Sequence, residues 1–149
     1  MEFIKRVSVI VLILSFSVLT FGMVNPSPSE ETTVKSTIEK FVNATENNDS
    51  NTLNNILFKD FSFVKCNNFT KSQTPLTRGE YIDMVKSGKI GAWKSKLNIN
   101  SVDVQNNTAV AKVELLDTRV KESGFITLLK VDGNWQILSG VYTLESANK

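Results

Sequence analysis

The sequence contains no histidine, one cysteine and only three prolines in 149 residues. Without histidine, and with a single thiol, the chain cannot supply the usual ligand sets for zinc, haem or iron–sulfur clusters. The same absence excludes the serine–histidine and cysteine–histidine pairs that activate nucleophiles in many hydrolases. We therefore expect no metal and no cofactor.

The sequence also lacks an excess of charge of one sign. The chain has 17 basic and 15 acidic side chains, which give a formal net charge of +2. Proteins that bind nucleic acid concentrate basic side chains in a patch or groove, and this sequence does not, so we expect no nucleic-acid partner. A hydrophobic content of 41%, with nine phenylalanines, suits one folded domain of modest size.

Residues 1–22 have the pattern of a secretory signal peptide. Lys5 and Arg6 precede the apolar run 7–21, and Gly22 offers a small residue for cleavage. The run is shorter than the roughly 20 residues that span a bilayer, and an uncleaved anchor is the alternative. We predict a secreted or periplasmic bacterial protein, with no stable membrane span after cleavage. The expected organisation is signal peptide 1–22, linker 23–28, domain 29–145 and tail 146–149.

Cys66 is the only cysteine of this expected exported chain. In an oxidising compartment it has no disulfide partner within its own chain. Two interpretations stay open: a small buried hydrophobe near the end of a strand, or a disulfide between two copies of the chain.

Three predicted helices come before a predicted sheet. Ser27-Pro28-Ser29-Glu30 is typical of a helix start, with its first serine as the cap. Apolar residues at helical spacing extend this helix to Glu46. Ser50 is the expected cap of a second, short helix. A capping box at Thr77–Glu80 opens a third helix, which ends at Ser87-Gly88.

Strand patterns fill most of the remaining chain. Phe58–Cys66 alternates between apolar and polar residues, and the polar segment 67–76 is predicted to be a loop. A change of apolar parity at Asn100-Ser101 predicts a β-bulge. Asp132-Gly133, between two apolar stretches, predicts a hairpin. The expected architecture is α+β, with N-terminal helices packed on a curved antiparallel sheet that has four strands after the third helix.

The hairpin and the strand before it resemble a known superfamily. The matching segments are Ala109–Leu115, Leu128–Gly133 and Trp135-x-Ile137, and Thr77–Tyr81 stands where the third helix is expected. They are similar to the nuclear transport factor 2-like (NTF2-like) superfamily, and most closely to its branch of putative lumazine-binding proteins. The resemblance covers about residues 29–145.

The resemblance implies a cone-shaped α+β fold, in which helices and a strongly curved sheet enclose a pocket. Relatives use this pocket for isomerisation, dehydration, hydrolysis, small-ligand binding or protein partners, so the fold alone does not fix the function. It also implies dimerisation through the sheet, which is common in the superfamily. One departure is Gly124, because the branch often carries an acidic residue at this position.

Catalysis in such a pocket needs a carboxylate that moves a proton and a donor that stabilises the developing oxyanion. Tyr81 and Tyr142 are the only phenolic donors. Asp83 follows Tyr81 by two residues on a predicted helix and cannot converge with it, which leaves Asp117 at a strand end as the best carboxylate. We therefore assign no catalytic residue and expect a non-enzymatic protein. A ketosteroid-isomerase-like enzyme is the alternative.

Both faces of the predicted hairpin are apolar. A two-residue turn places Lys130 opposite Trp135, and a three-residue loop would exchange the faces of one strand. With the two-residue turn, one face holds Ile126, Leu128, Trp135, Ile137 and Val141, and the other holds Phe125, Thr127, Leu129, Leu138 and Tyr142. We expect helices to cover one face, and a ligand or a second copy of the chain to cover the other.

The predicted function is binding of a small apolar or aromatic ligand inside the cone. The expected ligand-binding residues are Tyr81, Phe125, Thr127, Trp135 and Tyr142. Aromatic side chains with a hydroxyl suit this role because a buried hydroxyl needs a polar partner or a ligand. The expected partners are a small molecule and a second copy of the chain in a homodimer. A dimeric protein-interaction module is the alternative function.

Overall fold

The computed structural model describes residues 29–91 and 93–147. The expected signal peptide 1–22, the linker 23–28 and the last two residues of the chain lie outside the described residues. Within the described part, no helix is both long enough and apolar enough to cross a membrane.

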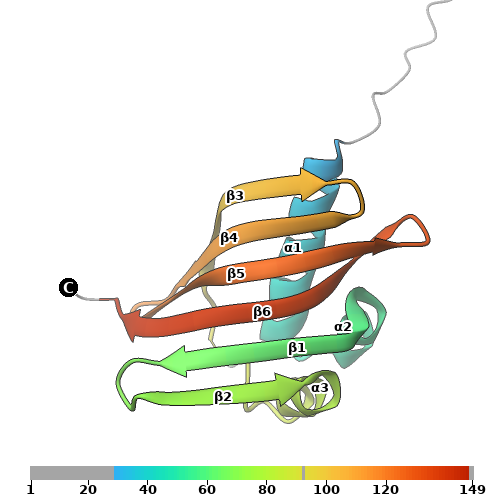
Figure 1. The fold of residues 1–149 in the computed structure, drawn as a ribbon. Helices are drawn as coiled ribbons and strands as arrows, with labels where there is room; N and C mark the ends of the chain where they lie inside the picture. Colours follow the sequence, from blue (N-terminus) through green and yellow to red (C-terminus); the bar gives the residue numbers. More distant parts are fainter. Residues whose placement is uncertain (1–28, 92, 148–149) are drawn as a thin grey trace, which may run out of the picture.

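Three helices lie on one face of a curved six-stranded sheet (Figure 1). The helices are α1 (Glu30–Glu46), α2 (Ser50–Ile56) and α3 (Arg78–Lys86). The strands are β1 (Leu57–Asn67), β2 (Ser72–Thr77), β3 (Lys96–Gln105), β4 (Thr108–Leu116), β5 (Val120–Val131) and β6 (Asn134–Ser146). The α+β architecture, with N-terminal helices on a curved sheet, is as predicted, although β6 runs one residue beyond the expected domain end at 145.

The sheet is mixed rather than antiparallel, and its strand order is β2-β1-β6-β5-β4-β3. The β1 strand runs parallel to β6 and antiparallel to β2. The prediction of a loop over residues 67–76 is wrong, because β2 occupies the second half of this segment. Its side chains are polar and mostly exposed, and it carries Pro75, which an edge strand tolerates. An exposed edge strand lacks the apolar alternation by which a strand is recognised.

Two helix caps differ from the prediction by one or two residues. The Thr32 amide donates to Ser29 Oγ at 3.2 Å, so Ser29 caps α1. The Thr52 amide donates to Asp49 Oδ1 at 3.0 Å, so Asp49 rather than Ser50 caps α2. In both places two capping residue types stand close together, and the pattern alone does not separate them. The capping box of α3 at Thr77–Glu80 is confirmed.

The β5–β6 hairpin has the predicted two-residue turn, with Lys130 opposite Trp135. A bulge in β6 then changes the faces of the strand. Thr127 pairs with Ser139 and Leu128 with Ile137, so Leu138 has no partner on β5. The expected faces of Val141 and Tyr142 are therefore wrong. The bulge places Tyr142 beneath the helices and Val141 on the outer face. The other bulge, between Ile99 and Ser101, is confirmed.

Candidate functional site

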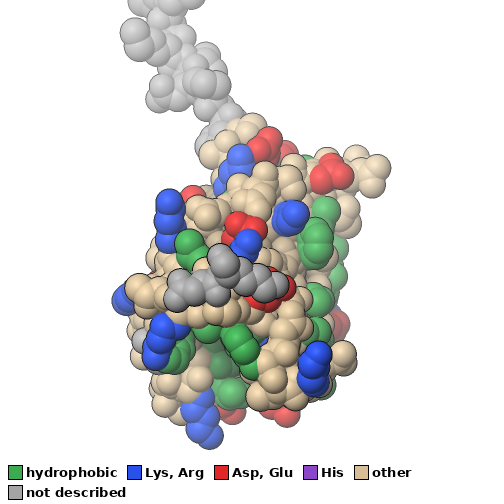
Figure 2. Space-filling view, turned by 90° about the vertical axis from the view of Figure 1, so that its left-hand side faces the viewer, with side chains coloured by type: hydrophobic (Ala, Val, Ile, Leu, Met, Phe, Trp, Pro, Cys, Tyr) green, Lys and Arg blue, Asp and Glu red, His purple; other side chains and the backbone are tan. Residues whose placement is uncertain are grey.

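A cavity of about 290 Å³ lies between α1, α3 and the inner face of the sheet. Its lining includes residues near the β1–β2 turn, such as Lys65, and near the β4–β5 turn, such as Leu115. Figure 2 looks at this end of the sheet, where hydrophobic side chains gather between lysine and arginine side chains. The cavity therefore lies toward one end of the cone.

Aromatic rings form the apolar wall of the cavity. The Tyr81 ring lies 5.7 Å from Phe41 and 5.1 Å from Phe63, measured between ring centroids. The Phe63 ring lies 5.3 Å from that of Tyr142. These rings come from α1, α3, β1 and β6, so the wall forms only when the helices pack on the sheet. Flat aromatic surfaces of this kind suit a ligand with its own ring system.

Tyr142 carries the most unusual polar group of the cavity. Only 1% of its surface is exposed, and its hydroxyl has no hydrogen-bond partner among the described residues. Burial raises the pKa of this phenol well above 10, and the nearby Tyr81 and Glu122 raise it further. The group therefore stays protonated at neutral pH. Among the described residues it is an unsatisfied hydrogen-bond donor, and it belongs to a residue that lines the cavity.

The hydroxyl of Tyr81 is satisfied by the protein itself. It lies 3.0 Å from Thr45 Oγ1, at the end of α1. Burial raises the pKa of this phenol too, and the hydrogen bond with Thr45 opposes part of that rise. Tyr81 therefore acts mainly as wall, whereas Tyr142 has an unused donor.

An ion pair contributes charge to the same cavity. Lys65 Nζ lies 2.5 Å from Glu122 Oε1, and the two side chains are 34% and 20% exposed. Lys65 stands on β1 and Glu122 on β5, so their side chains meet across the intervening β6. Neither residue is among the predicted site residues. In β5, Glu122 faces the same side of the sheet as Gly124 and Ile126. The first residues of this strand are polar, so the sequence pattern does not identify them as part of the sheet.

A loop before β3 forms part of the cavity lining and is anchored to the end of α1. The Ser95 amide donates to Glu46 Oε1 at 2.7 Å. Trp93 is 49% exposed, and the guanidinium of Arg119 lies 3.9 Å from the centroid of its ring. Gly91 has φ +86°, and a Cβ there would collide with the Thr45 carbonyl. Trp93 thus lines the cavity while it remains half exposed to solvent.

The five expected ligand-binding residues do not line one site. Tyr81 and Tyr142 lie in the cavity wall. Phe125 and Thr127 lie on the opposite face of the sheet, where Phe125 is 53% exposed and Thr127 Oγ1 lies 2.7 Å from Ser139 Oγ. Trp135 packs beneath the start of α1, and its Nε1 donates to Glu30 Oε2 at 2.8 Å. Ligand binding at Tyr81 and Tyr142 stays a prediction.

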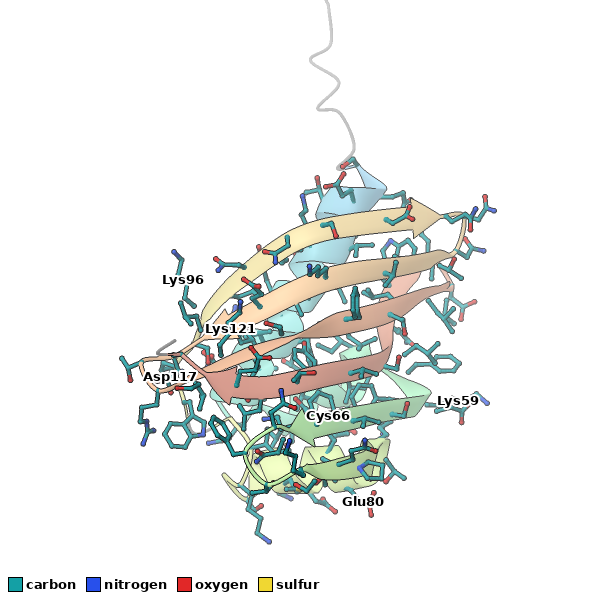
Figure 3. All side chains as sticks on the ribbon, turned by 60° about the vertical axis from the view of Figure 1, so that its left-hand side comes forward. Lys59, Cys66, Glu80, Lys96, Asp117 and Lys121 are labelled. Atoms are coloured by element: carbon teal, nitrogen blue, oxygen red, sulfur yellow. The ribbon has the colours of Figure 1, made fainter. Side chains whose placement is uncertain are left out.

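The expected carboxylate does not belong to this cavity. Asp117 lies in the β4–β5 turn, at the end of the sheet (Figure 3), where it accepts from the Thr118 hydroxyl and the Arg119 amide. These hydrogen bonds lower the pKa of its carboxyl. Two carboxylates, Glu46 and Glu122, share the cavity with the tyrosines. Among the described residues, no group of three or more histidine, cysteine, aspartate or glutamate side chains is placed to hold a metal ion.

Cys66 lies near the end of β1 and is labelled in Figure 3. Its thiol is free within the chain and its side chain is half-buried. It pairs with Thr143 of β6 in the register of the sheet, so it stands on the outer face rather than in the cavity.

Helices packed on a curved mixed sheet around a cavity at one end define an NTF2-like protein, and solved structures with this fold match the chain. An NTF2-like protein of unknown function from Silicibacter pomeroyi is 26% identical, with a TM-score of 0.66 over 76% of this chain and 93% of that one. An NTF2-like protein from Cytophaga hutchinsonii is 20% identical, with a TM-score of 0.67 over 79% and 100% of the two chains. One of unknown function from Methylobacillus flagellatus is 23% identical, with a TM-score of 0.67 over 82% and 97%.

The sequence profile of one family matches residues 29–143, which include all three helices and nearly all of the sheet. This chain belongs to that family, described as "Putative lumazine-binding". The predicted superfamily and branch are therefore confirmed. No curated protein matches the chain.

Proposed function

We propose that this protein binds a small, flat, largely apolar ring compound that presents a hydrogen-bond acceptor to Tyr142. The observation that carries the proposal is the buried hydroxyl of Tyr142, which has no partner among the described residues although Tyr142 is one of the residues that line the cavity. Leaving a buried donor unsatisfied costs about 1–3 kcal/mol, and native structures seldom retain such a group without a reason. A ligand acceptor would remove this cost.

The size and lining of the cavity limit the ligand class. About 290 Å³ is near the lower end of the range for small-molecule sites, which begins at roughly 300 Å³. Such a volume suits one or two fused rings. The rings of Phe41, Phe63 and Tyr81 offer stacking surfaces to such a ligand. Lumazine, the bicyclic pteridine in the family's description, has this size, flatness and set of acceptors, so we take it as the first probe.

Binding without catalysis fits the charged groups of the cavity better than proton transfer does. A general base needs a carboxylate that is available to the substrate proton. In this cavity the Glu122 carboxylate is engaged by the ammonium of Lys65 at 2.5 Å. The other carboxylate of the cavity, that of Glu46, accepts from the Ser95 amide. A ketosteroid-isomerase-like enzyme would need one of these two carboxylates to reach the substrate proton. We therefore propose a carrier or sensor of the ligand rather than an enzyme.

A thermal-shift panel tests the proposal. It compares pterins, flavins, steroids and fatty acids at equal concentration with the purified protein. We expect pterins of lumazine size to raise the midpoint of thermal unfolding, because a ligand that binds only the folded state stabilises it. The Tyr142→Phe variant should show a smaller rise. If no compound in any class stabilises the protein, the proposed function is wrong.

A second proposal concerns the outer face of the sheet, and its expected occupant is a second copy of this chain. Phe125, Val141 and Val110 are 53%, 47% and 39% exposed there, and Phe125 pairs directly with Val141. The same face carries Lys112 and Asp103 on neighbouring strands, so both signs of charge are present, as a self-complementary interface needs. We propose that two copies pack through this face.

Sedimentation analysis of the wild type and of Phe125→Asp tests the dimer. The wild type should sediment as a dimer at tens of micromolar, and the variant as a folded monomer. A wild-type monomer at this concentration contradicts the interface.

Export of the protein is a separate proposal, which rests on the sequence of residues 1–22 alone. It predicts that protein recovered outside the cytoplasm lacks these residues by mass spectrometry.

A further inference from the structure

The Lys65–Glu122 ion pair is placed where a ligand in the cavity would meet it. In the sheet register, Lys65 of β1 lies beside Tyr142 of β6, and Glu122 of β5 lies opposite Leu144. Both side chains therefore reach over β6 at the level of Tyr142 and Leu144. Both line the same cavity as Tyr142.

Stability alone gives a weak reason for this pair. A partly buried ion pair loses part of the hydration of both charges, and well-packed apolar residues of similar size often stabilise a fold equally well. Along β1, the two nearest positions of the same parity before Lys65 are occupied by Phe61 and Phe63, both buried. Lys65 thus follows two phenylalanines on the face of the sheet that the helices cover, and it is paired with a glutamate on the same face. This placement indicates a role in ligand binding rather than in packing.

Each member of the pair keeps unused hydrogen-bonding capacity. The Lys65 ammonium has three donors, and among the described residues it makes one hydrogen bond, to Glu122 Oε1. A carboxylate oxygen can accept more than one hydrogen bond, so Glu122 Oε1 keeps acceptor capacity beside the ammonium. The pair therefore presents a donor and an acceptor side by side, and their charges cancel.

We propose that Lys65 and Glu122 recognise the edge of a cyclic amide, that is, a ring in which an N–H stands next to a C=O. The carbonyl accepts from Lys65 and the N–H donates to Glu122. In such a ring the nitrogen and oxygen are about 2.2 Å apart, from bonds of about 1.33 and 1.23 Å that meet at about 120°. This nearly matches the 2.5 Å between Lys65 Nζ and Glu122 Oε1, so two parallel hydrogen bonds form. The inference rests on the proposed function, because it names what the cavity selects.

The ion pair has no net charge, which also disfavours charged ligands and purely apolar ligands. A carboxylate such as that of a fatty acid would compete with Glu122 for Lys65 and leave like charges adjacent, which costs free energy. A purely apolar ring would leave the polar groups of the pair without new partners when it displaces water. A neutral ring amide avoids both costs. The pair is thus a specificity determinant, whereas the aromatic wall supplies most of the buried apolar contact.

The test compares lumazine with 1,3-dimethyllumazine by titration calorimetry. The two compounds share the fused ring system and its carbonyl groups, but the methyl groups add bulk and remove both ring N–H donors. We expect the wild type to bind lumazine at least about tenfold more tightly, the magnitude expected from one good charge-assisted hydrogen bond. In the double variant Lys65→Met/Glu122→Leu, the two ligands should bind equally. Glu122→Gln keeps the size of the side chain and should reduce the preference, so it serves if the double variant does not fold.

The outcomes separate this inference from the proposed function. Equal binding of both compounds by the wild type overturns the amide-edge inference and leaves a ring-binding cavity. A preference for lumazine that persists in the variants also overturns the amide-edge inference, because the discrimination between the two ligands then does not depend on Lys65 and Glu122. If neither compound binds, both the amide-edge inference and the proposed pteridine ligand are wrong. A merely structural ion pair would change stability in the variants without changing the ratio of the two affinities.

Discussion

Gly124 lies directly opposite Tyr142 in the β5–β6 ladder, and the Tyr142 ring occupies the space that a side chain at position 124 would need. A Cβ at this position would come 2.9 Å from Tyr142 Cα and 3.0 Å from its Cγ, and would collide with the Val141 carbonyl. On β6, Gly140 makes similar room, because a Cβ there would lie 3.1 Å from Tyr142 Cε2. The two glycines thus allow a tyrosine ring to lie close against the sheet.

This relationship predicts that Gly124→Ala destabilises the protein. The added methyl group must displace backbone or the start of the Tyr142 side chain, and overpacking of this kind costs about 1–3 kcal/mol. Urea unfolding measures the loss. Gly79→Ala is the matched control, because nothing lies within 4 Å of a Cβ there and it stands in a helix, so it should be neutral or stabilising. An unchanged midpoint for Gly124→Ala would contradict the close packing.

Tyr142→Phe should have opposite effects on stability and on ligand binding. Removal of an unsatisfied buried hydroxyl should raise the free energy of unfolding of the ligand-free protein by up to about 1–3 kcal/mol. The same change should weaken lumazine binding by about tenfold, because the ligand acceptor loses its donor. Urea unfolding and calorimetry measure the two quantities. A less stable variant with unchanged affinity would show that the hydroxyl serves the fold.

Tyr81→Phe is the control for this variant. Its hydroxyl lies 3.0 Å from Thr45 Oγ1 and is already satisfied. Its loss should lower the free energy of unfolding by about 0.5–1.5 kcal/mol and leave the Thr45 hydroxyl without this partner. Ligand affinity should change little. Equal effects of the two substitutions on ligand affinity would contradict the distinction between wall and donor.

Alkaline pH should destabilise the fold through both tyrosines. Burial raises the pKa of Tyr81 and Tyr142 above 10, so the folded state keeps protons that the unfolded chain releases above pH 10. The free energy of unfolding should therefore be unaffected below this range and fall above it, by up to about 1.4 kcal/mol per pH unit for each tyrosine. Urea unfolding between about pH 8 and about pH 11 measures the slope. In Tyr142→Phe the fall should be shallower, and an equal slope would contradict the pKa shift of Tyr142.

Ligand binding should change the fluorescence of Trp93. The chain has two tryptophans, and only Trp93 lines the cavity, whereas Trp135 packs beneath α1. A ring compound in the cavity should quench Trp93 or shift its emission. The change should disappear in Trp93→Phe. If it persists there, the ligand lies near Trp135, and the site is elsewhere.

The sequence predicts the local elements of this fold better than their pairing. Caps, turns and apolar spacing depend on neighbouring residues, so the three helices, the bulge at Asn100-Ser101 and the Asp132-Gly133 hairpin are recognisable. The parallel pairing of β1 with β6 joins distant segments, and no local pattern encodes it. The edge strand β2 is not predicted, because its exposed side chains do not alternate between apolar and polar residues.

The candidate site is only half predictable for a similar reason. Both faces of β6 are apolar, so the sequence pattern does not reveal the bulge at Leu138, which exchanges the two faces. Tyr142 is therefore assigned to the wrong face. The cavity itself combines Tyr81 from a helix with Glu122 from a strand whose polar start resembles a loop. Such a meeting depends on the curvature of the sheet, which is a tertiary property.

The central claim is that a ligand meets the hydroxyl of Tyr142, and the chain offers a direct measurement of it. Tyr81 and Tyr142 are its only tyrosines, so isotope labelling of tyrosine rings gives two sets of NMR signals, which Tyr→Phe variants assign. On addition of lumazine, the Tyr142 ring signals should shift most and saturate with the ligand. Ring signals of Tyr142 that stay unmoved at saturating lumazine would contradict the account.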